Sequence, residues 1–243
     1  MTDLLFLGGA ALMAGLLRGV TGFGFALAAV PLFSLVIPPL DAVLLALLLQ
    51  ILAAPLDLMR MRRGRAAPDL WPLCVGAMIF TPVGALLASS LSVDLLRLMI
   101  AVTVCLGLGA LLSGVQIRSG PGPALATGVV AGLMGGLAAM PGPAAVTYFL
   151  GSGREKAETR AALLVFFAFA ACLALLTLAV TSEVLSTRAV LRAGSLWPVM
   201  LLGTWLGTRI FDRLGDGQYR RAAIAVLAFS AAVCASRGLA GLI

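Results

Sequence analysis

Long apolar runs without charge alternate with short charged stretches along this chain of 243 residues. An α-helix needs about 20 residues to cross the hydrocarbon core of a bilayer, and an arginine near either end can reach the membrane surface. On this basis the pattern predicts six ordinary transmembrane helices, at residues 41–59, 70–91, 95–114, 161–182, 189–211 and 221–242.

Two further apolar stretches, residues 3–38 and 123–150, do not fit one helix each because residues that break helices interrupt them. The first is interrupted at Arg18–Gly24, and the second at Gly135-Gly136 and again at Pro141–Pro143. Non-helical backbone at membrane depth is stable only where protein or water can bond its polar groups. Each stretch is therefore predicted to be a broken helical element.

The two broken elements resemble each other. Gly15 pairs with Gly132 and Gly19 with Gly136 at the same separation in sequence, and after a slip of one residue Gly24 pairs with Gly142. Three predicted crossings follow each element. We therefore expect one integral membrane domain over residues 1–243, all-α and polytopic, with about eight membrane segments in two repeats at about 3–114 and 123–242. Chance matching in a chain rich in Gly, Leu and Ala is the alternative.

The placement of basic residues indicates how the repeats are oriented. If each broken element crosses the membrane once, the basic residues other than Arg18 divide eight to eight between the two sides. If each element enters and leaves on the same side, they divide twelve to four, as the positive-inside rule requires. This favours inverted repeats that each begin with a re-entrant hairpin, with the 60–65 loop in the cytoplasm.

Composition excludes several classes of function. Hydrophobic residues make up 61% of the chain and charged residues 11%, with a mean hydropathy of +1.10, whereas soluble domains carry about 25% charged residues. The absence of histidine excludes imidazole catalysis and His-ligated metals, and no pair of acids has a plausible mid-membrane spacing. We expect no enzyme activity, metal or cofactor. The net charge is +7. We expect the basic residues to lie in short loops, where they set the membrane topology and do not bind nucleic acid.

The breaks are the candidate binding sites. A half-helix that starts in mid-membrane exposes backbone N–H groups and a positive dipole end, and glycine lets an oxyanion approach them closely. Arg18 lies between two apolar runs with no acidic neighbour in sequence, so an anion is a natural partner, although Arg18 could instead snorkel to the membrane surface. The candidate substrate-binding residues are Arg18, Gly19, Thr21, Gly22, Gly24, Gln50, Gly136, Pro141, Gly142, Pro143 and Tyr148.

Two of these candidates have structural alternatives. Gln50 lies in the middle of the 41–59 helix, where a hydrogen bond between helices is as plausible as a contact with a ligand. Tyr148 could donate to a ligand, or it could anchor its helix at the membrane interface.

The stretch Gly15–Gly24, followed by Pro31-Leu32, resembles the N-terminal signature of the TauE/SafE family of sulfite exporters. Residues 128–136, Pro141–Leu150 and Arg160–Leu163 resemble the second repeat of that family. One departure is the second break, which reads Ala-Ala-Met-Pro-Gly-Pro where the family often has a Gly-x-Gly-Gly run.

The resemblance implies a secondary transporter in the bacterial inner membrane that exports sulfite, sulfoacetate or related organosulfonates. Alternating access about the two broken helices is the expected mechanism. The expected partners are a small anion and the lipid bilayer, and a homodimer is left open. The alternatives are a transporter of another small organic anion and a membrane scaffold or assembly subunit that transports nothing.

The inverted topology predicts that two distant loops face the same compartment. With the native cysteines replaced, Arg62→Cys and Arg213→Cys should both react with an impermeant maleimide in inside-out vesicles and not in intact cells. Arg188→Cys should show the reverse pattern. Labelling of Arg62→Cys and Arg213→Cys from opposite sides would exclude this topology.

Overall fold

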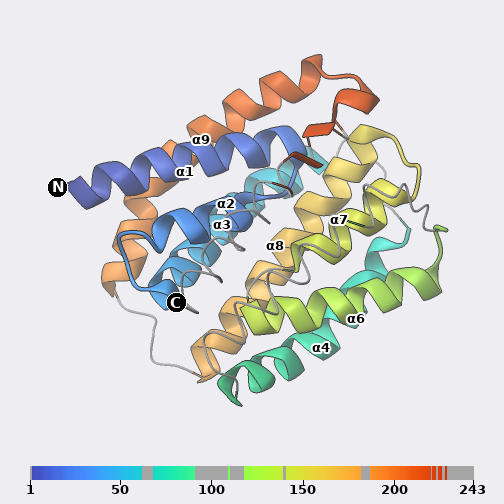
Figure 1. Cartoon of the computed structure of the whole chain (residues 1–243), viewed down its shortest axis with the longest axis horizontal. Helices are drawn as coiled ribbons and strands as arrows, with labels where there is room; N and C mark the ends of the chain where they lie inside the picture. The colour runs from blue at the N-terminus through green and yellow to red at the C-terminus, as the bar shows by residue number, and fades with distance from the viewer. Residues whose placement is uncertain are drawn as a thin grey trace.

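The computed structural model describes residues 2–61, 68–90, 109, 118–138, 141–181, 187–219, 221–222, 224–225 and 228. Over these ranges the regular structure is entirely helical (Figure 1). The helices are α1 (Thr2–Thr21), α2 (Phe25–Phe33), α3 (Pro39–Met61), α4 (Leu70–Ser90), α6 (Pro121–Ala138), α7 (Gly142–Gly151), α8 (Lys156–Thr181) and α9 (Thr187–Arg213). The predicted helices at 95–114 and 221–242 fall almost wholly outside the described residues.

Helix breaks occur in both stretches where sequence predicted them. In the first stretch α1 and α2 are separated by Gly22–Gly24, here called the first tip, where Gly22 and Gly24 have φ values of 82° and 86°. In the second, α6 ends at Ala138 and α7 begins at Pro141-Gly142, here called the second tip. The helices that follow the tips are short, with nine residues in α2 and ten in α7.

The predicted extent of both breaks was too wide. Arg18–Thr21 belongs to the last turn of α1, and Gly135-Gly136 lies inside α6. Glycine lowers helix propensity by only about 1 kcal/mol relative to alanine, and packing against a neighbouring helix can outweigh that cost. In the described residues of the two breaks, glycines with positive φ separate α1 from α2, and Pro141 precedes the start of α7.

The α6–α7 segment starts and finishes at the same end of the molecule. The Gly120 N–H, just before α6, lies 3.3 Å from the Tyr148 hydroxyl, near the end of α7. Figure 1 shows α1 and α6 running in opposite directions, each doubling back into its short helix. Opposite directions are what an inverted duplication requires, and the duplication itself stays a prediction.

Close glycine contacts join two pairs of helices that are far apart in sequence. Gly15 and Gly19 of α1 lie so close to α9 that an added Cβ would overlap the carbonyl oxygens of Met200 and Thr204. In the same way, Gly128 of α6 has no room for a Cβ against Leu73 of α4. Small residues are needed at such contacts because dispersion forces in a bilayer reward close backbone approach.

The two partner helices, α4 and α9, present the same pattern to these glycines. In each helix a buried threonine donates to the carbonyl four residues earlier, from Thr81 to Ala77 at 2.7 Å and from Thr204 to Met200 at 3.0 Å. A glycine follows three residues after each threonine, at Gly84 and Gly207. The contact of α1 with α9 and that of α6 with α4 therefore look alike in residue type and spacing.

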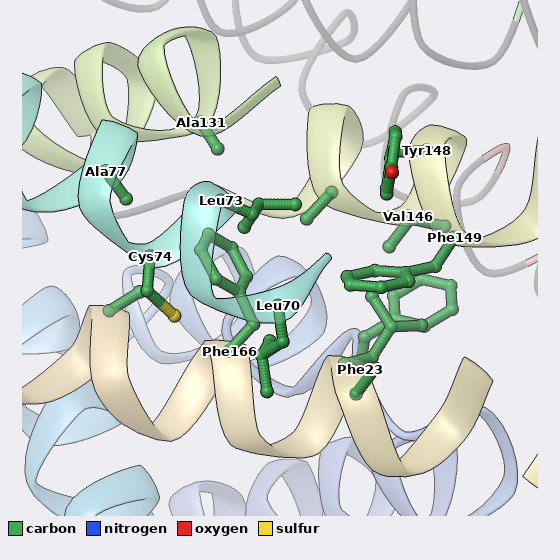
Figure 2. Close-up of a cluster of buried hydrophobic side chains, with 14 of the residues drawn as sticks. Phe23, Leu70, Leu73, Cys74, Ala77, Ala131, Val146, Tyr148, Phe149 and Phe166 are labelled. Carbon is green, nitrogen blue, oxygen red and sulfur yellow. The ribbon is translucent and has the colours of Figure 1, made fainter. Parts of the chain in front are cut away.

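Buried apolar side chains form two clusters, one for each group of helices. One lies among α1, α2, α3 and α9, and the other lies among α4, α6, α7 and α8 and includes Leu27 of α2. Phe23 of the first tip enters the second cluster and lies with Leu70, Tyr148, Phe149 and Phe166 (Figure 2). The first tip is thereby tied to the opposite group of helices.

Three of the described helices are long and apolar enough to cross a membrane, at Asp3–Thr21, Lys156–Leu178 and Thr187–Arg213. Shorter apolar segments occupy Asp41–Leu56, Leu70–Gly84 and Pro121–Leu137. Large apolar side chains are exposed on these helices, for example Val180 at 87% and Trp71 at 75%. Such exposure fits a surface that faces lipid and not water, and it agrees with the predicted membrane protein.

The tight α1–α9 contact predicts a large difference between two glycines of the same helix. Gly15→Leu should force the helices apart, whereas Gly8→Leu should be tolerated because nothing lies within 4 Å of an added Cβ there. Overpacking costs about 1–3 kcal/mol, which is a fall of several degrees in melting temperature for a chain of this size. Thermal unfolding of the purified protein in detergent measures both variants, and equal melting temperatures would contradict the predicted contact.

Candidate functional site

A small cavity lies where the two short helices begin. Gly24 and Leu27 at the start of α2 and Pro141 and Gly142 at the start of α7 line it. The side walls come from the middle of α3, including Gln50, and from the middle of α8. Both broken elements therefore contribute to one site, although their tips are more than a hundred residues apart in sequence.

The first turn of α2 and the second tip are nearly in contact across this cavity. A Cβ added to Gly142 would lie 3.4 Å from Leu27 Cδ1 and 3.5 Å from the ring of Phe167 in α8. The cavity has a volume of about 20 Å³, which is space for roughly one water molecule. A sulfite ion, with one sulfur and three oxygens, is larger, so the tips must separate to admit such a ligand.

Both short helices begin without a side-chain cap. The N-cap residues are Gly24 for α2 and Pro141 for α7, and neither makes a side-chain hydrogen bond to its helix. The first N–H groups of a helix have no partner within the helix, and the aligned peptide dipoles make this end positive. Two such ends facing one cavity form an environment that attracts an anion.

Gln50 is the polar side chain among the residues that line the cavity. It is buried, with 7% of its surface exposed. Its amide nitrogen can donate a hydrogen bond to a ligand oxygen, and its amide oxygen can accept a hydrogen bond from another group. The other described lining residues present apolar side chains or backbone.

The family model "Sulfite exporter TauE/SafE" matches residues 7–234. The chain belongs to the TauE/SafE family. No curated protein and no solved structure matches the chain. Because TauE/SafE proteins are transporters, the family supports a membrane transporter of sulfur-containing anions as the broad function.

In this TauE/SafE protein the cavity brings together four of the predicted substrate-binding residues: Gly24, Gln50, Pro141 and Gly142. The other predicted residues lie elsewhere in the closed arrangement. Pro143 is buried in the first turn of α7 and does not line the cavity. Gly136 packs against α4, where its Cα lies 3.1 Å from the position of a Cβ on Gly84.

The remaining predicted residues of the first half form the end of α1. Arg18 is buried, with 4% of its surface exposed, and its carbonyl accepts from the Gly22 N–H at 2.8 Å. The Thr21 hydroxyl lies 2.8 Å from the carbonyl oxygens of both Leu17 and Phe23. Gly19 is at the α9 contact. These residues build the first tip without lining the closed cavity.

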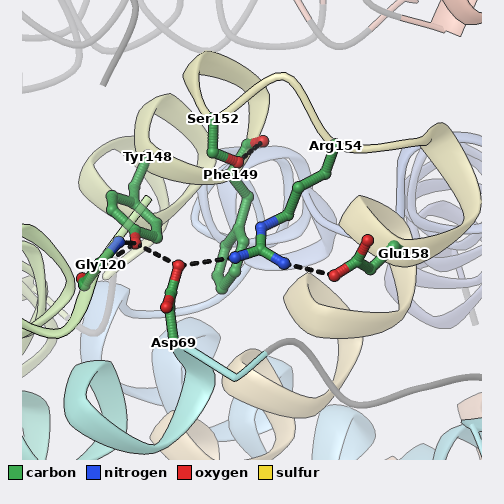
Figure 3. A network of polar contacts seen from close by, with 7 residues as sticks. All are labelled: Asp69, Gly120, Tyr148, Phe149, Ser152, Arg154 and Glu158. Carbon is green, nitrogen blue, oxygen red and sulfur yellow. Dashed lines mark hydrogen bonds and ion pairs between the residues drawn. The ribbon is translucent and has the colours of Figure 1, made fainter. Parts of the chain in front are cut away.

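Tyr148 belongs to a polar network at the end of the molecule where α4, α6 and α8 begin (Figure 3). Its hydroxyl donates to Asp69 Oδ2 at 2.7 Å, and Arg154 Nη2 donates to the same oxygen at 2.6 Å. The other guanidinium nitrogen of Arg154 pairs with Glu158. The hydroxyl that was expected to contact a ligand therefore holds helix ends together.

The two acidic neighbours of Arg154 stabilise its charged form. Burial alone lowers the pKa of Arg154, but hydrogen bonds and charges from Glu158 and Asp69 outweigh burial and raise that pKa. Sequence reasoning did not single out Asp69, although an acid directly before the apolar run of α4 was a usable signal. Within the described part of the chain, no group of three or more His, Cys, Asp or Glu side chains is placed to hold a metal.

The network predicts an order of stability losses. Asp69→Ala leaves the Arg154 guanidinium and the Tyr148 hydroxyl without their shared acceptor, and breaking such a buried pair costs about 3–5 kcal/mol. Tyr148→Phe removes one hydrogen bond and should cost about 1 kcal/mol. Asp212→Ala, at an exposed position of α9, is the control and should be neutral. Thermal unfolding ranks the variants, and a neutral Asp69→Ala would contradict the network.

Proposed function

We propose that this TauE/SafE protein is a secondary transporter that exports sulfite or a small organosulfonate across the bacterial inner membrane. The observation that carries the proposal is the meeting of two uncapped helix N-termini across one cavity beside Gln50. A sulfite or sulfonate group has three oxygens. It can therefore accept hydrogen bonds from both helix starts and from the Gln50 amide at once.

The closed cavity supports an alternating-access mechanism. Separation of α2 from α7 on one side of Leu27 and Phe167 would admit the anion from the cytoplasm, and separation on the other side would release it. Such rocking of two halves about a central site is common in transporters built from repeats. In this proposal the re-entrant hairpins are the moving parts that carry the two tips.

The membrane potential is a sufficient energy source in this mechanism. Moving one negative charge out of a cell whose interior is negative is favourable by about 2.3 kcal/mol per 100 mV. The cavity needs no proton carrier for such export, and the described lining residues include no acidic side chain. Arg18 is proposed to raise the local positive potential on the path to the first tip, and its replacement by Gln should weaken anion binding.

The proposal predicts that Gln50 affects binding far more than an exposed glutamine does. A hydrogen bond to a charged group contributes about 1.5–3 kcal/mol, so Gln50→Leu should weaken sulfite binding at least tenfold. Gln218→Leu is the control, because Gln218 is exposed and lies outside the cavity, where its Oε1 accepts from the Gly215 N–H at 2.9 Å. Thermal stabilisation measures affinity, since a ligand at a hundredfold excess over Kd adds about 2.7 kcal/mol.

The ligand panel for this experiment separates the competing functions. It contains sulfite, sulfoacetate, sulfate, thiosulfate, taurine and short carboxylates. Stabilisation by sulfite or a sulfonate supports the proposed substrate class, and stabilisation by carboxylates alone would replace it with another organic anion. If no anion stabilises the protein, the export proposal fails and the non-transporting scaffold is favoured.

A further inference from the structure

Arg160, in the second turn of α8, joins three separate elements at the end of α1. Its Nη2 donates to the Gly19 carbonyl at 2.6 Å and to the Thr208 hydroxyl of α9 at 2.9 Å. Its guanidinium carbon lies 4.4 Å from the centroid of the Phe211 ring. One side chain therefore links α8, the last turn of α1 and the end of α9.

The first tip rests directly on Arg160. A Cβ added to Gly22 would lie 2.6 Å from Arg160 Cγ and 2.9 Å from its carbonyl oxygen. Gly22 also has a φ of 82°, a conformation that residues with a side chain rarely adopt. Glycine at position 22 allows the close contact with Arg160, whereas Gly24 lines the cavity.

Tyr219 completes the same contact from the segment after α9. Its hydroxyl donates to the Thr21 carbonyl at 2.7 Å, and its ring lies edge-on to Phe211 at a centroid distance of 5.6 Å. Gly19 and Thr21 thus have their carbonyl oxygens bonded by side chains from other elements. The last carbonyls of a helix have no partner within the helix, and a cation there also interacts favourably with the helix dipole.

Arg160 is connected to the cavity through its own helix. Phe167, which lines the cavity beside Gly142, lies two turns further along α8, at a distance of about 10 Å along the axis. On its other side, Arg160 supports Gly22, two residues before Gly24 of the cavity wall. A movement of α8 relative to α1 would therefore shift both Phe167 and the first tip, which lie on opposite sides of the cavity.

We propose that Arg160 is the positioning residue of the substrate site: it holds the first tip so that the start of α2 faces Gly142 and Gln50. Arginine suits this role because its planar fork donates in two directions while its face stacks on an aromatic ring. The effect on substrate rests on the proposed function, whereas the effect on the tip does not.

The test compares Arg160→Met and Arg160→Lys with Arg209→Met. Arg209 also stacks on an aromatic ring, with its guanidinium carbon 3.8 Å from the centroid of Trp205, but it is exposed and its stacking partner lies on its own helix, α9. Hydrogen exchange of the amides at 22–28 reports the position of the tip, and calorimetric titration with sulfite reports binding. Thr208→Val removes one of the two hydrogen bonds and provides a milder variant if Arg160→Met does not fold.

Arg160→Met should speed exchange at 22–28 at least tenfold, leave exchange in α3 and the middle of α8 unchanged, and weaken sulfite binding about tenfold. Arg160→Lys should recover part of both effects, Thr208→Val should give smaller changes at the same amides, and Arg209→Met should match the wild type. Unchanged exchange at 22–28, or equal acceleration in α3 and α8, would overturn the positioning role. Selective acceleration at the tip in a protein that binds no sulfite would uphold the positioning role and reject the proposed substrate.

Discussion

Helix ends that meet in the interior of a protein leave backbone groups that the helix itself cannot bond, and this constraint organises the described residues around the two tips. The carbonyl end of α1 is satisfied by protein, because Arg160 bonds the Gly19 oxygen and Tyr219 bonds the Thr21 oxygen. The amino ends of α2 and α7 differ from it, because no side chain caps either of them. The carbonyl end of α1 is thus bonded by side chains, and the amino ends of α2 and α7 face the cavity.

The glycine contacts explain how such ends are held in place. Each long arm of a broken element packs tightly on a helix from the other half of the chain, α1 on α9 and α6 on α4. The short helices α2 and α7 carry the tips between these two pairs, with α3 and α8 packed against each other. The result is two tight helix pairs that flank the centre where the starts of α2 and α7 meet.

Much of this arrangement could be predicted from the sequence because its signals are local. Glycine and proline mark the tips, apolar length marks the helices, and Gln50 stands out in an apolar run. The extent of the breaks could not be read in this way, since α1 remains helical through Arg18–Thr21 and α6 through Gly135-Gly136. Tertiary packing decides those residues, and propensity alone does not.

Contacts between residues far apart in the chain could not be predicted from the sequence, because they too depend on tertiary packing. Arg160 and Gly19 are separated by 141 residues, and Asp69 and Arg154 by 85. Nothing in a single chain indicates which charged side chain meets which carbonyl or carboxylate at such separations. Tyr148 illustrates the difficulty, because its hydroxyl suits a ligand as well as it suits Asp69, and only the fold places it beside Asp69.

The size of the cavity has a consequence for the electrical integrity of the membrane. Leu27, Gly142 and Phe167 leave space between the tips for roughly one water molecule. Proton conduction needs a continuous file of hydrogen-bonded waters, and a single water is not a file. If the protein exports anions as proposed, the site would hold no continuous file of waters while Leu27, Gly142 and Phe167 lie this close, and anion export would then carry no parallel leak of protons.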